Sequence, residues 1–179
     1  MKPFIGILLS LCTAVNLSGE GWEIDQRPNI IYIMADDLGY GDLSCYGQKK
    51  FKTPHIDRIA REGVKFTDYY AGSTVCAPTR CVLMTGMHTG HAYVRGNRSV
   101  KPEGQAPMPR DIVTLPRLLK KVGYATGMFG KWGLGAPGSE SDPVEHFDTF
   151  YGYNCQGQAH TFYPKHLWHN DQKILLDSK

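Results

Sequence analysis

The sequence predicts an α/β fold in which helices flank a mainly parallel β-sheet, and three observations support this prediction. Residues 29–34 form a short, β-branched apolar run without alternation, which is typical of a strand buried on both faces. Two later segments carry Pro at the start and Gly at the end of a helical pattern. Polar residues follow the apolar runs, and α/β sheets gather ligands beyond the carboxyl ends of their strands.

The two expected helices are marked by the signals at their ends. The first begins with Pro54 after Thr53 and ends before Gly63, and the second runs over residues 115–122 with Thr114 as its cap. Pro is favoured in a first turn because its missing N–H has no intrahelical partner there, and Gly readily ends a helix. At 179 residues the chain is long enough for these elements to share one core.

Further strands and one long loop are expected between and after these helices. Residues 64–70 alternate like a strand, and residues 124–129 form the next strand. Residues 167–176 have the pattern of a hairpin with an Asn-Asp turn. Residues 89–111 are polar and rich in Gly and Pro, which predicts a long surface loop of the kind that often forms a substrate rim.

The N-terminus has the features of a secretory signal peptide. One basic residue precedes an apolar run over residues 4–15 that is too short to span a bilayer, so residues 1–19 are expected to be the signal. The alternative is a buried first strand. No later segment has the pattern of a transmembrane helix, so the protein is expected to be exported to the periplasm or out of the cell, or to be lysosomal or secretory in a eukaryote.

Composition and cysteine content limit the possible partners and crosslinks. The net charge is +3 without a long Lys/Arg block, which gives little reason to expect a nucleic-acid partner. Export would leave four of the five cysteines in residues 20–179. If Cys76 is chemically consumed, three cysteines remain, which permits one disulfide and one free thiol.

The run Cys76-Ala77-Pro78-Thr79-Arg80 predicts a reactive thiol at the start of a helix. Pro78 fits a first helical turn, so Cys76 lies at or just before the helix start, where exposed N–H groups and the helix dipole favour anions and thiolates. Arg80 lies about one turn further and can share a face with Cys76. Together they frame a pocket for a tetrahedral oxyanion. The alternative is a buried structural Cys beside a solvated Arg.

Charged side chains follow two of the expected strands. Asp36 and Asp37 come directly after residues 29–34, and adjacent carboxylates repel one another and gain from a hard divalent cation. An Asp-Asp pair can also be a simple turn or cap. Lys131 follows the strand expected over residues 124–129, and so lies at another carboxyl end.

Three motifs in this order resemble the N-terminal half of a type I, formylglycine-dependent sulfatase, an arylsulfatase-like member of the alkaline phosphatase superfamily. They are residues 29–37, 76–86 and 130–135. The resemblance implies that a separate maturation enzyme oxidises Cys76 to formylglycine, whose hydrate is the nucleophile. It also implies that Asp36 and Asp37 bind Ca²⁺ together with the formylglycine at position 76, that Arg80 supports the formylglycine and that Lys131 contacts the sulfate.

Two departures from this family pattern affect what is expected of the chain. Most sulfatases carry a His two residues after the lysine, where this chain has Gly133, and His160 is a candidate replacement as acid or base. The family's later metal ligands, a further His and a further Lys come from a region downstream of Lys179. Residues 20–179 therefore look like the N-terminal portion of a sulfatase catalytic domain, and we expect an incomplete fold, weak calcium binding and little activity from them alone.

The resemblance implies a sulfuric ester hydrolase that acts on an aryl or carbohydrate sulfate. A phosphodiesterase or phosphonate hydrolase of the same superfamily is the alternative enzyme, because that superfamily shares the metal. The alternative without catalysis is a sulfatase-like fragment that binds an ion or a sulfated glycan.

Overall fold

The computed structural model describes residues 27–176, so the expected signal peptide lies outside the described residues. The chain divides into two compact units with the boundary after Ala35. In the first unit, the buried strand expected over residues 29–34 is wrong: the segment is extended but forms no strand, and Ile31 and Ile33 are 86% and 81% exposed. An apolar run becomes a buried strand only where neighbouring strands cover it, and no strand of the described residues pairs with this one.

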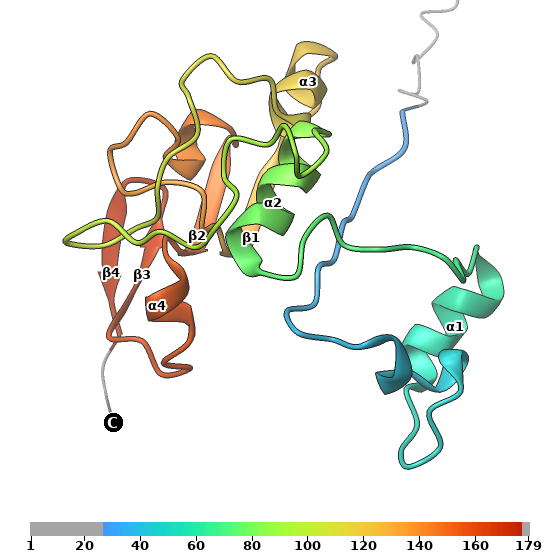
Figure 1. Cartoon of the computed structure of the whole chain (residues 1–179). Coiled ribbons are helices and arrows are strands. Elements are labelled where there is room, and N and C mark those ends of the chain that lie inside the picture. The colour runs from blue at the N-terminus through green and yellow to red at the C-terminus, as the bar shows by residue number, and fades with distance from the viewer. Residues whose placement is uncertain (1–26, 177–179) are drawn as a thin grey trace, which may run out of the picture. The chain divides into compact units, whose positions relative to one another are not determined.

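The second unit holds a four-stranded sheet, which confirms the α/β class (Figure 1). Its order is β1-β2-β3-β4. Strands β1 and β2 are parallel, and the β2–β3 and β3–β4 pairs are antiparallel, so the sheet within the described residues is mixed. The strands are β1 (Gly127–Lys131), β2 (Thr149–Tyr153), β3 (His166–His169) and β4 (Gln172–Leu175).

The expected hairpin and helices are present at the predicted places. Strands β3 and β4 are joined by Asn170-Asp171, and Asn170 adopts φ 52°, as tight turns require. The α-helices are α1 (Pro54–Glu62), α2 (Cys76–Thr85), α3 (Leu115–Lys121) and α4 (Gln156–Ala159). Three 3₁₀ helices complete the elements of residues 27–176: η1 (Tyr40–Asp42), η2 (Ser44–Tyr46) and η3 (Pro143–Glu145).

The strand expected over residues 64–70 is wrong, because this segment has no regular structure and its apolar side chains are exposed. Hydrogen bonds with side chains hold this segment, since it has no strand partner in the part of the chain that the structure describes. The Tyr46 hydroxyl donates a hydrogen bond to the Phe66 carbonyl at 2.7 Å, and Lys65 Nζ donates to the Cys45 carbonyl at 3.1 Å. Alternation predicts a strand only where a neighbouring strand is available for pairing.

Two other segments differ from the sequence prediction. Residues 149–153 form β2, although their aromatic and Gly-containing pattern did not indicate a strand. This segment is a strand because it pairs with β1 on one side and β3 on the other. Residues 89–111 form an irregular loop as expected, but the loop does not stay at the surface. Four of its apolar side chains are buried: Ala92, Val94, Ala106 and Met108. Isolated apolar residues within a polar loop therefore supplied part of the core.

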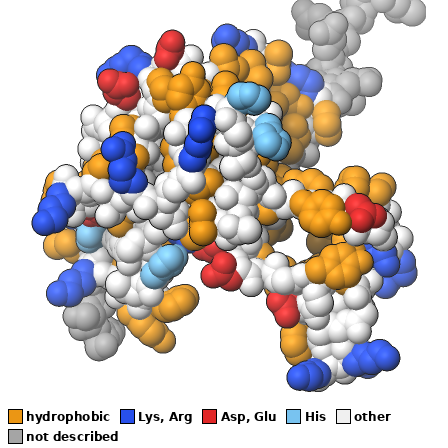
Figure 2. All heavy atoms as spheres, in the orientation of Figure 1, with side chains coloured by type: hydrophobic (Ala, Val, Ile, Leu, Met, Phe, Trp, Pro, Cys, Tyr) orange, Lys and Arg blue, Asp and Glu red, His pale blue; other side chains and the backbone are white. Residues whose placement is uncertain are grey.

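The core lies where α2 packs against the sheet (Figure 1). Ala77 and Cys81 of α2 share one buried cluster with Phe150 of β2 and with Trp132 and Leu134, which follow β1. This packing fixes the first turn of α2 relative to the end of β1. Many other hydrophobic side chains lie on the surface, as Figure 2 shows for one face.

A buried histidine completes this region of the second unit. His146 is fully buried, with Nδ1 at 3.1 Å from Thr114 Oγ1 and Nε2 at 3.1 Å from Ser141 Oγ. Burial, with the positive charges of Arg117 and Lys120, lowers the pKa of His146 from 6.5 to about 4. The ring is therefore neutral at pH 7 and serves the packing of the unit.

We expect the stability of the second unit to fall as the pH falls from 6.5 toward 4. In this window the unfolded chain binds a proton at His146 and the folded chain does not, which costs on the order of 3 kcal/mol of unfolding free energy by pH 4. Denaturant unfolding of the wild type and of His146→Gln across this range measures it. The variant should have a lower free energy at pH 7 and a flatter pH dependence; equal slopes for both proteins would contradict the assignment.

Candidate functional site

Cys76 is the first residue of α2, as the sequence predicts, and Pro78 lies in the first turn. Val75 precedes the helix with an extended backbone and no side-chain cap. The Ala77 N–H instead donates a hydrogen bond of 3.0 Å to Asn97 Oδ1 from the long loop. The thiol therefore stands at a helix N-terminus that a distant side chain, Asn97, holds in place.

Lys131, the last residue of β1, brings its ammonium group to this thiol. Its side chain is buried, and Nζ lies 3.5 Å from Cys76 Sγ and 3.3 Å from His160 Nε2. The same ammonium forms an ion pair with the Asp36 carboxylate. The sequence placed Lys131 at a strand end, and the structure adds that β1 ends directly beside the start of α2.

Arg80 connects the helix to the strand. Its guanidinium is buried, Nη1 donates a hydrogen bond to the Lys131 carbonyl, and Nη2 lies 3.9 Å from Asp36 Oδ2. Burial lowers the pKa of Arg80, and the charge of Asp36 opposes this shift. An arginine keeps its charge even so, and the solvated Arg that the alternative interpretation required is therefore not observed.

The Asp36 carboxylate is the anionic partner of both cations. Partial burial would raise the pKa of Asp36, but the hydrogen bond and charge of Lys131, with the charges of Arg80 and His160, hold it below the ordinary 3.8. Its Oδ1 also lies 4.0 Å from Cys76 Sγ. The site thus combines one carboxylate and two buried cations around a thiol, and the two cations could bind a tetrahedral oxyanion.

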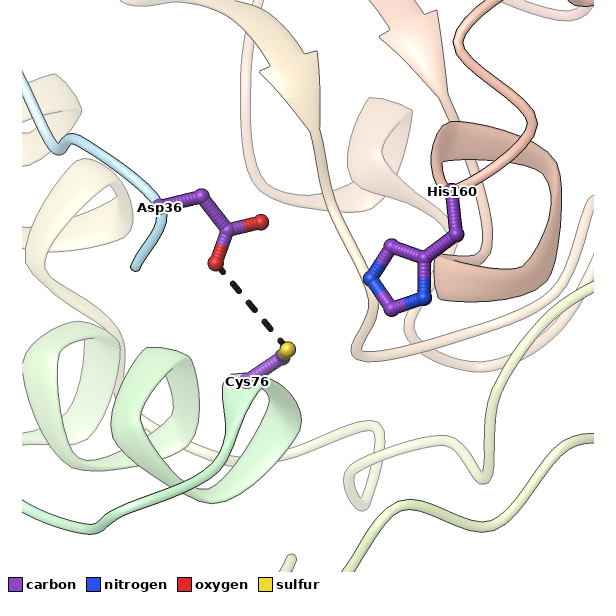
Figure 3. Close-up of side chains that lie close together, drawn as sticks. All are labelled: Asp36, Cys76 and His160. Atoms are coloured by element: carbon purple, nitrogen blue, oxygen red, sulfur yellow. Dashed lines mark hydrogen bonds between the residues drawn. The ribbon is translucent and has the colours of Figure 1, made fainter. Parts of the chain in front are cut away.

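Asp36, Cys76 and His160 point toward one another (Figure 3), with ligand atoms that all lie within 4.8 Å. His160, the candidate acid or base of the sequence analysis, directly follows α4. Asp37 is not part of this group; it is exposed and has φ 59°. The group offers oxygen, sulfur and nitrogen donors, whereas calcium prefers oxygen alone. Replacement of Sγ by an oxygen would bring this set closer to a calcium site.

Gly133 has a local reason to be glycine. It adopts φ 73°, and a Cβ atom at this position would overlap the side chain of Gln156 in α4. Both side-chain amide atoms of Gln156 are buried without a hydrogen-bond partner among the described residues. A His cannot occupy position 133 without displacing Gln156, and no pattern in the sequence indicated this packing.

We expect Gly133→Ala to destabilise the second unit by about 1 to 3 kcal/mol, because it combines a left-handed backbone with steric overlap. Adding Gln156→Ala should recover part of the lost stability, because it removes the steric overlap but leaves the left-handed backbone at position 133. Gly157→Ala is the matched control in α4, where a Cβ meets nothing within 4 Å. Thermal unfolding compares these variants. Equal effects of Gly133→Ala and Gly157→Ala would contradict the packing argument.

The cysteines of the described chain are unpaired. Cys45, Cys76, Cys81 and Cys155 are all free thiols. The disulfide that the cysteine count permitted is therefore not formed among residues 27–176. Cys81 and Cys155 are buried, while Cys76 is partly exposed and stands beside Lys131. Cys45 is partly exposed as well, but at Cys76 an ammonium lies beside the sulfur itself, the environment that activates a thiol.

Almost the whole described chain matches one protein family. The family model described as Sulfatase covers residues 28–177. This chain belongs to the sulfatase family. The match confirms the resemblance carried by the three sequence motifs, and it places the chain with the arylsulfatase-like proteins, in their N-terminal part.

Two curated sulfatases illustrate the relationship. N-acetylgalactosamine-6-O-sulfatase of Bacteroides thetaiotaomicron is 47% identical over 131 residues, which are 71% of this chain and 25% of that protein. Arylsulfatase D of Homo sapiens is 40% identical over 161 residues, 84% of this chain and 27% of that protein. This sulfatase chain thus spans about a quarter of the length of these relatives.

Solved structures support the same fold. A structure from a glycosaminoglycan-metabolism locus of Bacteroides thetaiotaomicron has a TM-score of 0.72 and 37% identity, over 85% of this sulfatase chain and 33% of its own. Ps i-CgsB in complex with k-i-k-neocarrahexaose has a TM-score of 0.70 and 29% identity, over 84% of this chain and 38% of its own. These likenesses confirm the sulfatase-like α/β fold class. No helix within residues 27–176 is long and apolar enough to cross a membrane.

Proposed function

We propose that these residues form the N-terminal part of a sulfuric ester hydrolase that cleaves an aryl or carbohydrate sulfate, with formylglycine made from Cys76 as the nucleophile. The observation that carries the proposal is the position of Cys76 at the first residue of α2, 3.5 Å from Lys131 Nζ. A structural cysteine has no need of a buried ammonium beside its sulfur. The family to which the chain belongs supports the same reaction.

The chain's own cations would bind and orient the sulfate group. Lys131 and Arg80 are both buried, so their charges act in a medium of low dielectric constant and their positions are fixed before the substrate arrives. The hydrogen bond from Arg80 to the Lys131 carbonyl keeps both groups on one side of the nucleophile. Such preorganised charges stabilise the negative charge that develops on the sulfate oxygens.

His160 is the proposed acid or base in this half of the site. Its Nε2 lies 3.3 Å from Lys131 Nζ and belongs to the group formed with Asp36 and Cys76. A His at this place could pass a proton to a departing alcohol oxygen beside the lysine. Gly133 cannot serve this purpose because it has no side chain, and Gln156 fills the space beside it.

The proposal also needs formylglycine at position 76 and a calcium ion, and the donor atoms of the site fit these two groups in part. Formylglycine would replace the thiol with a hydrated aldehyde whose two hydroxyls allow attack on sulfur and later release of sulfate. Calcium would polarise the sulfate oxygens. Asp36 and the oxidised residue 76 would hold the ion, and Asp37 is proposed as a further ligand. Ligand atoms of Asp36, Cys76 and His160 all lie within 4.8 Å of one another, which supports a metal ion at this place.

Export and maturation belong to the same proposal. Residues 1–19 would act as the signal peptide, and a formylglycine-generating enzyme would modify Cys76 during export, when the motif around it is extended. The proposed substrate class is a sulfated small molecule or glycan. The names of the relatives support it, because one is an N-acetylgalactosamine-6-O-sulfatase and one solved neighbour holds k-i-k-neocarrahexaose.

A comparison of ester classes tests the reaction. The matured chain, joined to the downstream part of its Bacteroides relative, should hydrolyse 4-nitrophenyl sulfate faster than 4-nitrophenyl phosphate or its phosphodiester. The reason is that the family to which the chain belongs is that of the sulfatases. A clear preference for a phosphate ester would replace this proposal with a phosphoester hydrolase, and binding of a sulfated glycan without any turnover would favour a non-catalytic role.

A further inference from the structure

We propose that a cavity beside the N-terminus of α2 binds a second anionic group of a sulfated glycan, next to the sulfate at Cys76. This inference rests on the proposed function. The cavity has a volume of about 320 Å³. Its lining includes Tyr93, Arg95, Asn97, Arg98, Ala106 and Pro107.

The cavity is positively charged. Arg95 and Arg98 are among its lining residues, and no Asp or Glu is. Arg98 forms no ion pair and no side-chain hydrogen bond with any residue of the described chain, while Arg95 uses only Nε, in a hydrogen bond of 3.1 Å to the Ala92 carbonyl. Guanidinium groups without a carboxylate partner are suited to paired hydrogen bonds with a carboxylate or a sulfate.

The rest of the lining suits a sugar ring. The Tyr93 side chain is 56% exposed, although a ring of this size gains from being covered. Ala106 and Pro107 add apolar surface beside it. An acidic sugar has an apolar ring face and an anionic group, and this lining offers a partner to each. The ring carbons of the sugar would stack on Tyr93, and its anionic group would pair with the two arginines.

Asn97 links the cavity to the nucleophile. Asn97 lines the cavity, its Oδ1 accepts the hydrogen bond from the Ala77 N–H, and Ala77 directly follows Cys76. A glycan whose sulfate lies at Cys76 therefore has the cavity within reach of a neighbouring part of the chain. The anionic group would be either a uronate carboxylate or a second sulfate ester.

Binding by the 179-residue chain tests the inference without any turnover. The probe is a sulfated, uronate-containing tetrasaccharide, titrated into the wild type, Arg98→Gln, Arg95→Gln and Arg110→Gln. We expect each cavity variant to weaken binding about tenfold, the effect of one lost charge-assisted hydrogen bond. Arg110 is exposed in the same loop but does not line the cavity, so its variant should bind like the wild type. Arg98→Gln breaks no contact within the described chain, which keeps the test valid if Arg95→Gln disturbs the fold.

The same titration with modified probes identifies the anionic group. If carboxyl reduction of the tetrasaccharide removes the effect of Arg98→Gln, the group is a carboxylate; if removal of the second sulfate does so, it is a sulfate. Wild-type binding by both cavity variants, an equal loss in Arg110→Gln, or an arginine effect that neither probe change removes would overturn the inference. Arginine-dependent binding without sulfate hydrolysis would count against the proposed function alone.

Discussion

Replacing Cys76 with Ser is expected to stop sulfate ester turnover, with a loss of more than about a thousandfold in kcat. A serine hydroxyl attacks once and remains as a stable sulfate ester, because it lacks the second hydroxyl that expels sulfate. The chain spans about a quarter of the length of its relatives, so the assay uses the chain joined to the downstream part of N-acetylgalactosamine-6-O-sulfatase. Hydrolysis of 4-nitrophenyl sulfate gives the rate.

Cys81→Ala is the matched control for this result. Cys81 lies in the same helix, but it is fully buried in the core, and its thiol faces Met108 Sδ at 3.9 Å. Its replacement leaves a small cavity and should lower stability while kcat stays within about a factor of two, because nothing in the site moves. Substantial turnover by Cys76→Ser, or a comparable loss in Cys81→Ala, would rule out residue 76 as the nucleophile.

Replacing Lys131 with Ala is expected to lower kcat by a factor on the order of a hundred to a thousand. The change removes the buried ammonium that contacts Cys76 Sγ, His160 Nε2 and the Asp36 carboxylate. Arg80 remains, at 3.9 Å from Asp36, so one of the two cations still binds the sulfate and some activity persists. The same chimaeric protein and substrate provide the measurement.

The formylglycine content separates catalysis from maturation in this variant. The maturation enzyme acts on an extended chain, in which Lys131 is far from Cys76, so Lys131→Ala should be modified as fully as the wild type. Lys121→Ala is the matched control, because this lysine is exposed at the end of α3. A normal kcat in Lys131→Ala, or a loss that follows a lower formylglycine content, would contradict the proposed role.

The helices and the hairpin were predictable because their signals are local. Pro54, Pro78 and Pro116 lie in the first turns of α1, α2 and α3, and a turn residue in a left-handed conformation joins β3 and β4. Such signals act within a few residues and need no partner from elsewhere. For the same reason the sequence placed Cys76 at a helix start and Lys131 at a strand end.

The errors concern features that depend on distant partners. Residues 29–34 and 64–70 have strand-like patterns but no pairing strand among the described residues, whereas β2 is a strand because β1 and β3 lie on either side of it. The role of Asn97 at the start of α2 and the overlap of Gln156 with position 133 arise from loop and helix packing. No spacing in the sequence encodes contacts of this kind.

The most direct test of the account is the chemical identity of residue 76 in the mature protein. Trypsin releases the peptide of residues 66–80, which contains one cysteine. After production together with a formylglycine-generating enzyme, its mass should correspond to an aldehyde at position 76, and a hydrazide reagent should label it. An unmodified thiol at this position, in a cell that converts a known sulfatase at the same time, would contradict the account.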